Sequence, residues 1–455
     1  MFRARTVRAA TLIAIAGLAV ASCGRTAATV AGPGSGSAAA PTSAASGPAG
    51  SGPAGSGPAG SGPAASDPAA SGPATGELNI WAQADEAAGL PPFAEEFMKA
   101  NPGLKISITP LPWDAAHNKY QTAIAGGSTP DMAQMGTTWM GDFKDAFAPL
   151  PSSIATSAFF EGSVKSTDIG GVKYGVPWYV DTRVIYYRTD LAKKAGYDSF
   201  PTNWDDFKTF AKAMQTKAGA KWGITLPTSG GDSFQSMLFF PWSAGAQLMN
   251  SDQTKWTLDS PQFLEAMKYY QSFFTDGIAN PSPDIDAGAA EAAFVDGSSP
   301  MLLAGPSGIG SISKAGGDGY KDKFSVGMVP KNKSATSFVG GSDLVVFKNS
   351  KNQDAAWKFI QWLSTPQVQV RWQQAVGDLP SVQSAWKQGT LATDPFLKVF
   401  GEQLKDTNSP PTVTTWTQVS AAADTVLEQI VKTGTDPAQA LKALQATADG
   451  IGSGG

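Results

Sequence analysis

The chain has 455 residues, a formal net charge of −4, one cysteine and one histidine, His117. With so few of these two residue types, a histidine-based metal centre and a Cys/His nucleophile pair are excluded. The mildly acidic balance, without a basic run, disfavours a nucleic-acid partner. Phosphate-binding Walker loops, zinc-ligand spacings and a Gly-x-Ser-x-Gly nucleophile motif are also missing from the sequence.

The first 22 residues have the pattern of a secretory signal. Three arginines precede an uncharged apolar stretch, Ala9–Ala21, which is too short for a comfortable membrane span. The segment Val20-Ala21-Ser22-Cys23 resembles a bacterial lipobox. We therefore expect residues 1–22 to be a lipoprotein signal peptide and Cys23 to be the lipidated first residue of the mature chain. The alternative is an unmodified thiol after a cleaved signal.

Residues 23–76 are rich in Ser, Gly, Pro and Ala and repeat in units of five from Ser46 onward. This stretch has no aromatic residue and cannot form a core, so we expect a tether of roughly 50 residues with a reach of about 40 Å. About 380 residues remain. That length is too great for one hydrophobic core and favours two lobes.

The first part of the globular region alternates strands and helices. The expected elements are strand Leu78–Ala82, helix Pro92–Ala100, strand Leu104–Thr109, helix Asp114–Ala125 and strand Met132–Met135. This alternation predicts an α/β fold with a parallel or mixed sheet covered on both faces. Ligands of such sheets bind beyond the carboxyl ends of the strands, which singles out the loops Ala82–Glu86 and Gly136–Trp139.

A second signal lies in residues 170–188. Pro177 keeps Val176 out of the helical region, so Val176–Val180 should be extended. The run Val184–Tyr187 has the composition of a buried strand.

This segment also carries a candidate binding set. Trp178 and Tyr179 offer ring faces, and Asp181 and Arg183 share one face of an extended chain. Rings that cover C–H faces, next to charged groups that bind hydroxyls, suit a neutral, hydroxyl-rich ligand. The alternative is a strand with ordinary aromatic packing and a surface ion pair.

The rest of the chain continues the alternation. The expected helices are Asp190–Gly196, Asn203–Gln215, Ser233–Gln247 with a break at Pro241, Pro261–Phe274, Ala289–Asp296, Asn352–Leu363, Pro395–Leu404, Trp416–Val431 and Pro437–Ala448. The expected strands are Trp222–Leu226, Met301–Ala304, Phe324–Pro330 and Leu344–Phe347. Helix Pro261–Phe274 has a proline in its first turn and an apolar stripe at helical spacing, so this stripe should be core.

The order of these weak motifs resembles family 1 extracellular solute-binding proteins, the sugar-capturing lipoproteins of bacterial ABC importers, which are similar to maltodextrin-binding protein. The motifs are LNIWAQADE, GGSTPDMAQMGTTWM, residues 170–188, Gly305-Pro306-Ser307, Phe338–Asp343 and Val376–Pro380. The resemblance covers residues 77–450. It implies a two-lobed periplasmic-binding-protein type II-like fold, in which each lobe is a mixed or parallel sheet flanked by helices and several crossovers form the hinge.

The resemblance also implies where the lobes lie and which residues face the ligand. The first lobe would be 77–180 and 335–378, the second 181–334 and 379–450, with a flexible end at 451–455. The implied ligand-binding residues are Gln83, Asp85, Thr138, Trp139, Trp178, Tyr179, Asp181, Arg183, Trp242, Gly305, Ser307, Gly340, Gly341, Asp378 and Trp416. The family often has tryptophan where this chain has Ser307, so Trp242 or Trp416 would compensate. For Asp85, a solvated loop is the alternative.

By this resemblance, the chain is a monomeric receptor that closes on a mono- to oligosaccharide and delivers it to separate permease subunits. It would be anchored by lipid at the outer face of the cytoplasmic membrane, without catalytic residues, metal or cofactor. One alternative is a secreted glycoside hydrolase, which would need a carboxylate pair that the sequence does not mark out. The others are a receptor for a non-sugar solute and an adhesin.

Overall fold

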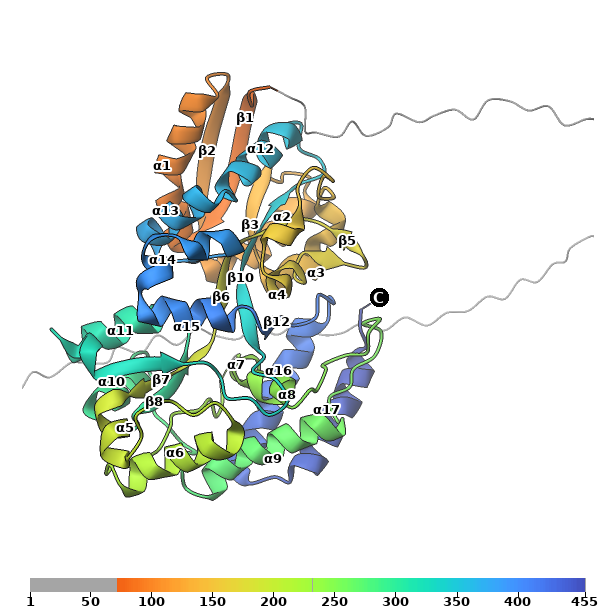
Figure 1. The fold of residues 1–455 in the computed structure, drawn as a ribbon. Helices are drawn as coiled ribbons and strands as arrows, with labels where there is room; N and C mark the ends of the chain where they lie inside the picture. Colours follow the sequence, from red (N-terminus) through yellow and green to blue (C-terminus); the bar gives the residue numbers. More distant parts are fainter. Residues whose placement is uncertain (1–71, 231, 455) are drawn as a thin grey trace, which may run out of the picture. The chain divides into compact units, whose positions relative to one another are not determined.

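The computed structural model describes residues 72–230 and 232–454. The expected signal peptide, Cys23 and nearly all of the expected tether lie outside the described residues. Within them, the chain forms two principal sheets with helices packed against each (Figure 1).

The larger sheet is mixed. Its strands run in the order β11 (Leu379–Pro380), β6 (Val176–Thr182), β10 (Ser337–Val346), β3 (Met132–Gly136), β1 (Gly76–Gln83) and β2 (Leu104–Leu111), with β12 (Thr407–Asn408) paired to β10. Strand β1 is parallel to β2 and β3, whereas β10 is antiparallel to β3 and β6. The carboxyl ends of β1, β2 and β3 therefore meet at one edge of the sheet, as the strand–helix alternation predicted.

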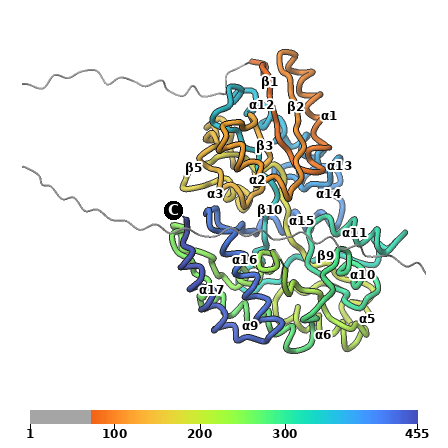
Figure 2. Tube along the Cα trace, turned by 180° about the vertical axis from the view of Figure 1, so that it is seen from behind, coloured from red at the N-terminus to blue at the C-terminus, as the bar shows by residue number. Residues whose placement is uncertain are grey.

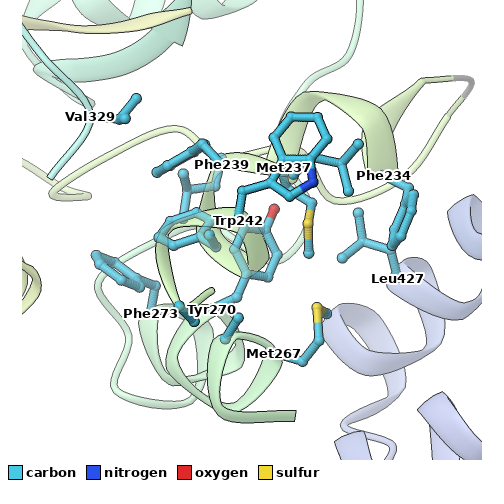
Figure 3. Packing of buried hydrophobic residues seen from close by; sticks show 14 of the residues in the cluster. Phe234, Met237, Phe239, Trp242, Met267, Tyr270, Phe273, Val329 and Leu427 are labelled. Atoms are coloured by element: carbon cyan, nitrogen blue, oxygen red, sulfur yellow. The ribbon is translucent and has the colours of Figure 1, made fainter. Parts of the chain in front are cut away.

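The second sheet has three antiparallel strands in the order β8 (Met301–Ala304), β7 (Val184–Arg188) and β9 (Phe324–Gly327). Its helices bury a large aromatic core, part of which Figure 3 shows around Trp242, Tyr270 and Phe273. The apolar stripe of α9 (Pro261–Thr275) lies in this core, which confirms the prediction for that helix. Helices α16 (Trp416–Glu428) and α17 (Pro437–Ile451) pack beside α9 (Figures 1 and 2).

The remaining α-helices pack around the two sheets. They are α1 (Ala84–Ala100), α2 (Trp113–Ala125), α3 (Met140–Phe143), α4 (Glu161–Val164), α5 (Thr189–Ala195), α6 (Trp204–Thr216), α7 (Ser233–Met237), α8 (Phe239–Ser243), α10 (Ala289–Asp296), α11 (Ser307–Gly316), α12 (Gln353–Leu363), α13 (Pro366–Val376), α14 (Gly389–Thr393) and α15 (Pro395–Gln403). A short hairpin, β4 (Asp168–Ile169) and β5 (Val172–Lys173), precedes β6.

Several predicted bounds change. The expected loop Ala82–Glu86 is wrong, because α1 begins at Ala84 directly after β1. The helix was predicted to begin at Pro92, yet α1 holds both Pro91 and Pro92 inside it. The acidic residues Asp85 and Glu86 occupy its first turn, where their negative charges interact favourably with the helix dipole. The expected strand Trp222–Leu226 forms only isolated bridges, to Ala279 and Leu302.

Two strands carry the chain between the sheets. Strand β6 ends at Thr182 in the larger sheet and β7 begins at Val184 in the smaller one, so Arg183 alone lies between them. Strand β10 returns the chain to the larger sheet and pairs with β6, with a register shift between Ser342 and Asp343.

Gly341 on β10 has to be glycine on two grounds. Its φ is +118°, and a Cβ at this position would lie 2.2 Å from the carbonyl oxygen of Tyr179. We expect Gly341→Ala to destabilise the protein by about 2 kcal/mol or more, because it adds a backbone clash to backbone strain. Urea unfolding measures this loss. Gly127→Ala is the control: its φ is also positive, at +64°, but the space around it is open. Equal losses in both variants would contradict the role given to the clash.

Candidate functional site

A cavity of about 500 Å³ lies between strands β6 and β10, the segment after β3 and the helices α7 and α16. Its lining residues are Trp113, Gly136, Thr137, Thr138, Trp139, Asp181, Arg183, Asp232, Gln235, Phe338, Gly340, Gly341, Trp416, Thr417, Ser420, Ala421 and Asp424. This volume is in the range of pockets for small organic ligands.

The cavity brings together about half of the residues singled out in the sequence. Those that line it are Thr138, Trp139, Asp181, Arg183, Gly340, Gly341 and Trp416. Gly305 lies against the ion pair of Asp181 and Arg183. A Cβ placed on Gly305 would be 2.6 Å from Asp181 Oδ1 and 2.8 Å from Arg183 Nη1.

Two of the expected tryptophans lie in hydrophobic cores and do not line this cavity. Trp178 is 1% exposed, and its ring centroid is 4.6 Å from that of Trp372, so neither ring face is free for a ligand. Trp242 is 3% exposed in the core of Figure 3, and borders a different cavity of about 960 Å³. Successive residues of a strand point to opposite faces, which explains why Trp178 and Tyr179 cannot both face one ligand.

Other expected site residues lie outside the cavity lining. Gln83 is fully buried, and its Nε2 donates to the Tyr120 hydroxyl at 2.8 Å. Asp85 lies in the first turn of α1, and Ser307 begins α11. Helix α11 was not predicted, because its glycines are poor helix formers.

One wall of the cavity is aromatic. Trp139 lies between Trp113, at a ring distance of 5.5 Å, and His117, at 5.4 Å. Gly136 lies beneath the indole, where a Cβ would be only 3.0 Å from the Trp139 ring. Sequence reasoning missed Trp113. The signal was available, because Trp113 follows the end of β2 and so lies at the same sheet edge as Trp139.

Charged groups at the junction of β6 and β7 form a second wall. Arg183 Nη1 donates to Asp181 Oδ2, and the guanidinium lies 5.5 Å from the ring centroid of Phe338. The other carboxylate oxygen, Asp181 Oδ1, is buried and has no hydrogen-bond partner within the described chain. An acceptor in this state is ready for a ligand hydroxyl or amine.

The third wall was not foreseen. Asp424 on α16 accepts hydrogen bonds from the Asp232 amide at 3.1 Å, the Ser233 hydroxyl at 3.0 Å and the Phe234 amide at 2.7 Å. This fixes the start of α7 and brings the Asp232 carboxylate to the cavity. Burial raises the pKa of Asp232, the nearby Asp424 raises it further and Arg183 lowers it. Asp232 and Asp424 are 192 residues apart, so no local pattern could pair them.

Acidic side chains also gather around Asp378, which does not line the cavity. Asp378 accepts a hydrogen bond from Trp372 Nε1 at 3.0 Å, and burial together with Glu86 raises the pKa of Asp378 to about 7. Burial is also the main cause of the raised pKa of Tyr179, followed by Glu86 and Asp378. Tyr179 accepts a hydrogen bond from the Ser342 hydroxyl at 3.2 Å. These residues do not line the cavity.

Within residues 72–230 and 232–454, no three His, Cys, Asp or Glu side chains are arranged to hold a metal ion. No helix of the same residues combines the length and the apolar character needed to cross a membrane.

The family model for "Bacterial extracellular solute-binding protein" matches residues 81–370. A putative binding protein of Brucella abortus is 28% identical over 380 residues, covering 81% of this chain and 92% of the relative. The maltotriose-binding protein of Pyrococcus abyssi is 25% identical and covers 78% of both chains.

Among solved structures, the sugar-binding protein MalE of Xanthomonas citri is similar, with a TM-score of 0.78 and 29% identity. The match covers 83% of this chain and 97% of that one. The two sheets and their helices therefore form an α/β periplasmic-binding-protein fold like that of MalE. Since the family model spans more than half of the sequence, the chain belongs to the bacterial extracellular solute-binding proteins.

Proposed function

We propose that this protein binds a sugar, from a monosaccharide to an oligosaccharide, and delivers it to the permease of an ABC importer. The observation that carries the proposal is the cavity itself, in which aromatic rings face unpartnered polar atoms. Trp113 and Trp139 can cover the C–H faces of a sugar ring, while Asp181 Oδ1 and Arg183 can bind its hydroxyls.

The similar structures support a sugar as the ligand class. MalE of Xanthomonas citri is a sugar-binding protein, and the relative from Pyrococcus abyssi binds maltotriose. The family consists of solute-binding proteins and not of enzymes, so the glycoside hydrolase considered above is set aside.

Capture would proceed by closure of two lobes. The first lobe is 77–180 with 335–378, and the second is 181–334 with 379–450. Closure would turn about the junction at Arg183 and about the segment between β9 and β10, where two of the crossovers connect the sheets. Hinge closure around a ligand between two domains is a common mechanism of binding proteins.

The family places the protein outside the cytoplasm. We further propose that lipid on Cys23 anchors it to the outer face of the cytoplasmic membrane, that residues 24–76 act as a tether, and that the receptor is a monomer. Metabolic labelling with a fatty-acid analogue, compared between the natural chain and Cys23→Ser, tests the anchor. Equal labelling of both chains would contradict it.

A thermal-shift screen of the chain without residues 1–22 against neutral mono- and disaccharides tests the proposed function. A ligand at 100 times its dissociation constant adds about 2.7 kcal/mol of stability, which raises the unfolding temperature measurably. If no sugar raises the unfolding temperature of the folded protein, the proposal is contradicted.

Trp139→Ala should weaken binding of any sugar found in this screen at least tenfold, or about 1.4 kcal/mol, because it removes the ring that faces the cavity. Isothermal titration calorimetry gives the dissociation constants. Trp222→Ala is the matched control, since Trp222 is partly exposed and lies outside the cavity lining. If both variants bind like the parent, the sugar binds elsewhere.

A further inference from the structure

The charges that line the cavity are unbalanced. Its wall holds three carboxylates, Asp181, Asp232 and Asp424, but one cationic side chain, Arg183. Arg183 forms its ion pair with Asp181. Within the described chain, no salt bridge joins Asp232 or Asp424 to a cation.

The excess of negative charge extends behind the wall. After α13, Asp378 has a raised pKa, and the charges of Glu86, Asp181 and Asp85 contribute to this shift after burial, so these carboxylates lie close together. On the aromatic side, His117 lies behind Trp139 and has its own carboxylate partner, Asp142, at 2.9 Å. It therefore leaves the excess unchanged.

Two polar atoms at the cavity wall lack a partner, independently of the charge count. Ser420 on α16 is only 6% exposed, lines the cavity and has no hydrogen bond to its Oγ within the described residues. Asp181 is partly exposed, but its Oδ1 atom is likewise buried and has no hydrogen bond within the described residues. Buried polar atoms are nearly always satisfied, so a bound ligand is expected to supply these missing partners.

We propose that the ligand of this cavity carries a positive charge, and specifically that it is a sugar with a protonated amino group. The inference rests on the proposed function and names the substrate class within it. An ammonium group has three donors and no acceptor, which matches a wall of carboxylate oxygens and a serine hydroxyl. Its attraction to Asp232 and Asp424 is stronger in a closed cleft than in water. The same field repels acidic sugars.

Isothermal titration calorimetry with matched sugars tests the inference. The probes are three triplets, built on glucose, galactose and mannose, in which the 2-hydroxyl is kept, replaced by an amine or replaced by an N-acetylated amine. At pH 6.5 and low salt, the amine of at least one triplet should bind tenfold or more tighter than its neutral congener. The N-acetyl sugar, which is uncharged, should lose this advantage. The preference should also fall as salt rises and as pH passes the pKa of the amine, about 8.

Asp232→Asn keeps the shape of the side chain and removes one charge. It should reduce the amine-to-neutral affinity ratio at least threefold. Asp318→Asn is the matched control, because Asp318 is exposed in the turn after α11 and lies outside the cavity lining. The ratio in this control should equal that of the parent chain. Thermal unfolding of both variants shows that they are folded.

The outcomes separate this inference from the proposed function. If neutral sugars bind and their amines bind no tighter, the inference is overturned and the proposed function stands. An amine preference that Asp232→Asn leaves unchanged also overturns the inference, since another feature then causes it. If no sugar of the triplets and no neutral disaccharide binds to the folded protein, the proposed function fails as well.

Discussion

Asp343→Asn is expected to make the protein more stable relative to the parent as the pH rises from about 4 to about 8. Asp343 on β10 is fully buried, and neither of its carboxylate oxygens has a hydrogen-bond partner within the described residues. Burial raises the pKa of Asp343 to about 8, and the nearby Ser166 hydroxyl lowers it only slightly. This hydroxyl gives its hydrogen to the Ser163 carbonyl at 2.7 Å, which explains why the carboxylate gains little from it.

The sign follows from proton binding. The folded chain keeps the Asp343 proton up to about pH 8, whereas the unfolded chain loses it near pH 3.8. The stability that this proton contributes is therefore complete below pH 3.8 and is lost as the pH rises to about 8, at about 1.4 kcal/mol per pH unit. Asparagine cannot ionise, so the variant lacks this loss and should gain about 4 kcal/mol on the parent between pH 4 and pH 7.

Urea unfolding of both chains at several pH values measures the difference. Asp378, whose pKa is also raised, to about 7, titrates in both chains and cancels in the comparison. Asp318→Asn is a control for amide substitution at an exposed carboxylate and should show no such slope. A constant difference between parent and Asp343→Asn from pH 4 to pH 8 would mean that Asp343 is ionised in the folded protein.

The parts of the fold that were predicted correctly are those with local causes. Pro177 requires an extended chain before it, and β6 begins at Val176 as expected. The bounds of α10 and β8 are the predicted ones, because each is a short apolar run closed by glycine or proline. The rule for the carboxyl ends of parallel strands singled out the loop Gly136–Trp139, and this segment lines the cavity.

The parts that were missed depend on distant contacts. Asp424 accepts a hydrogen bond from the amide of Phe234 in α7, which is 190 residues away in the sequence. No local sequence pattern near either residue predicts this hydrogen bond. Trp178 illustrates a different limit. Its strand was predicted correctly, but only the position of Trp372 from α13, a helix not foreseen, shows that its face of β6 is the core face.

Arg183→Ala should reduce the affinity for a neutral sugar about 100-fold. Arg183 is the one residue between β6 and β7, and it is the single cationic side chain of the cavity. Its loss removes a charged donor to the ligand and also leaves the Asp181 carboxylate unpaired in a partly buried site. Truncating one partner of such a pair costs about 2–5 kcal/mol of binding free energy, most of it from the charge left behind.

This origin of the effect predicts a specific result in a double-mutant cycle. Asp181→Ala in the Arg183→Ala background removes the unpaired charge, so the double variant should bind more tightly than the sum of the two single losses allows. Titration calorimetry of the four chains gives the coupling free energy. Arg371→Ala is the control and should leave the affinity unchanged. It breaks an exposed salt bridge, in which Arg371 Nη1 lies 2.7 Å from Glu96 Oε2. Strictly additive losses would mean that Asp181 and Arg183 contact the ligand independently and that their ion pair does not hold the site together.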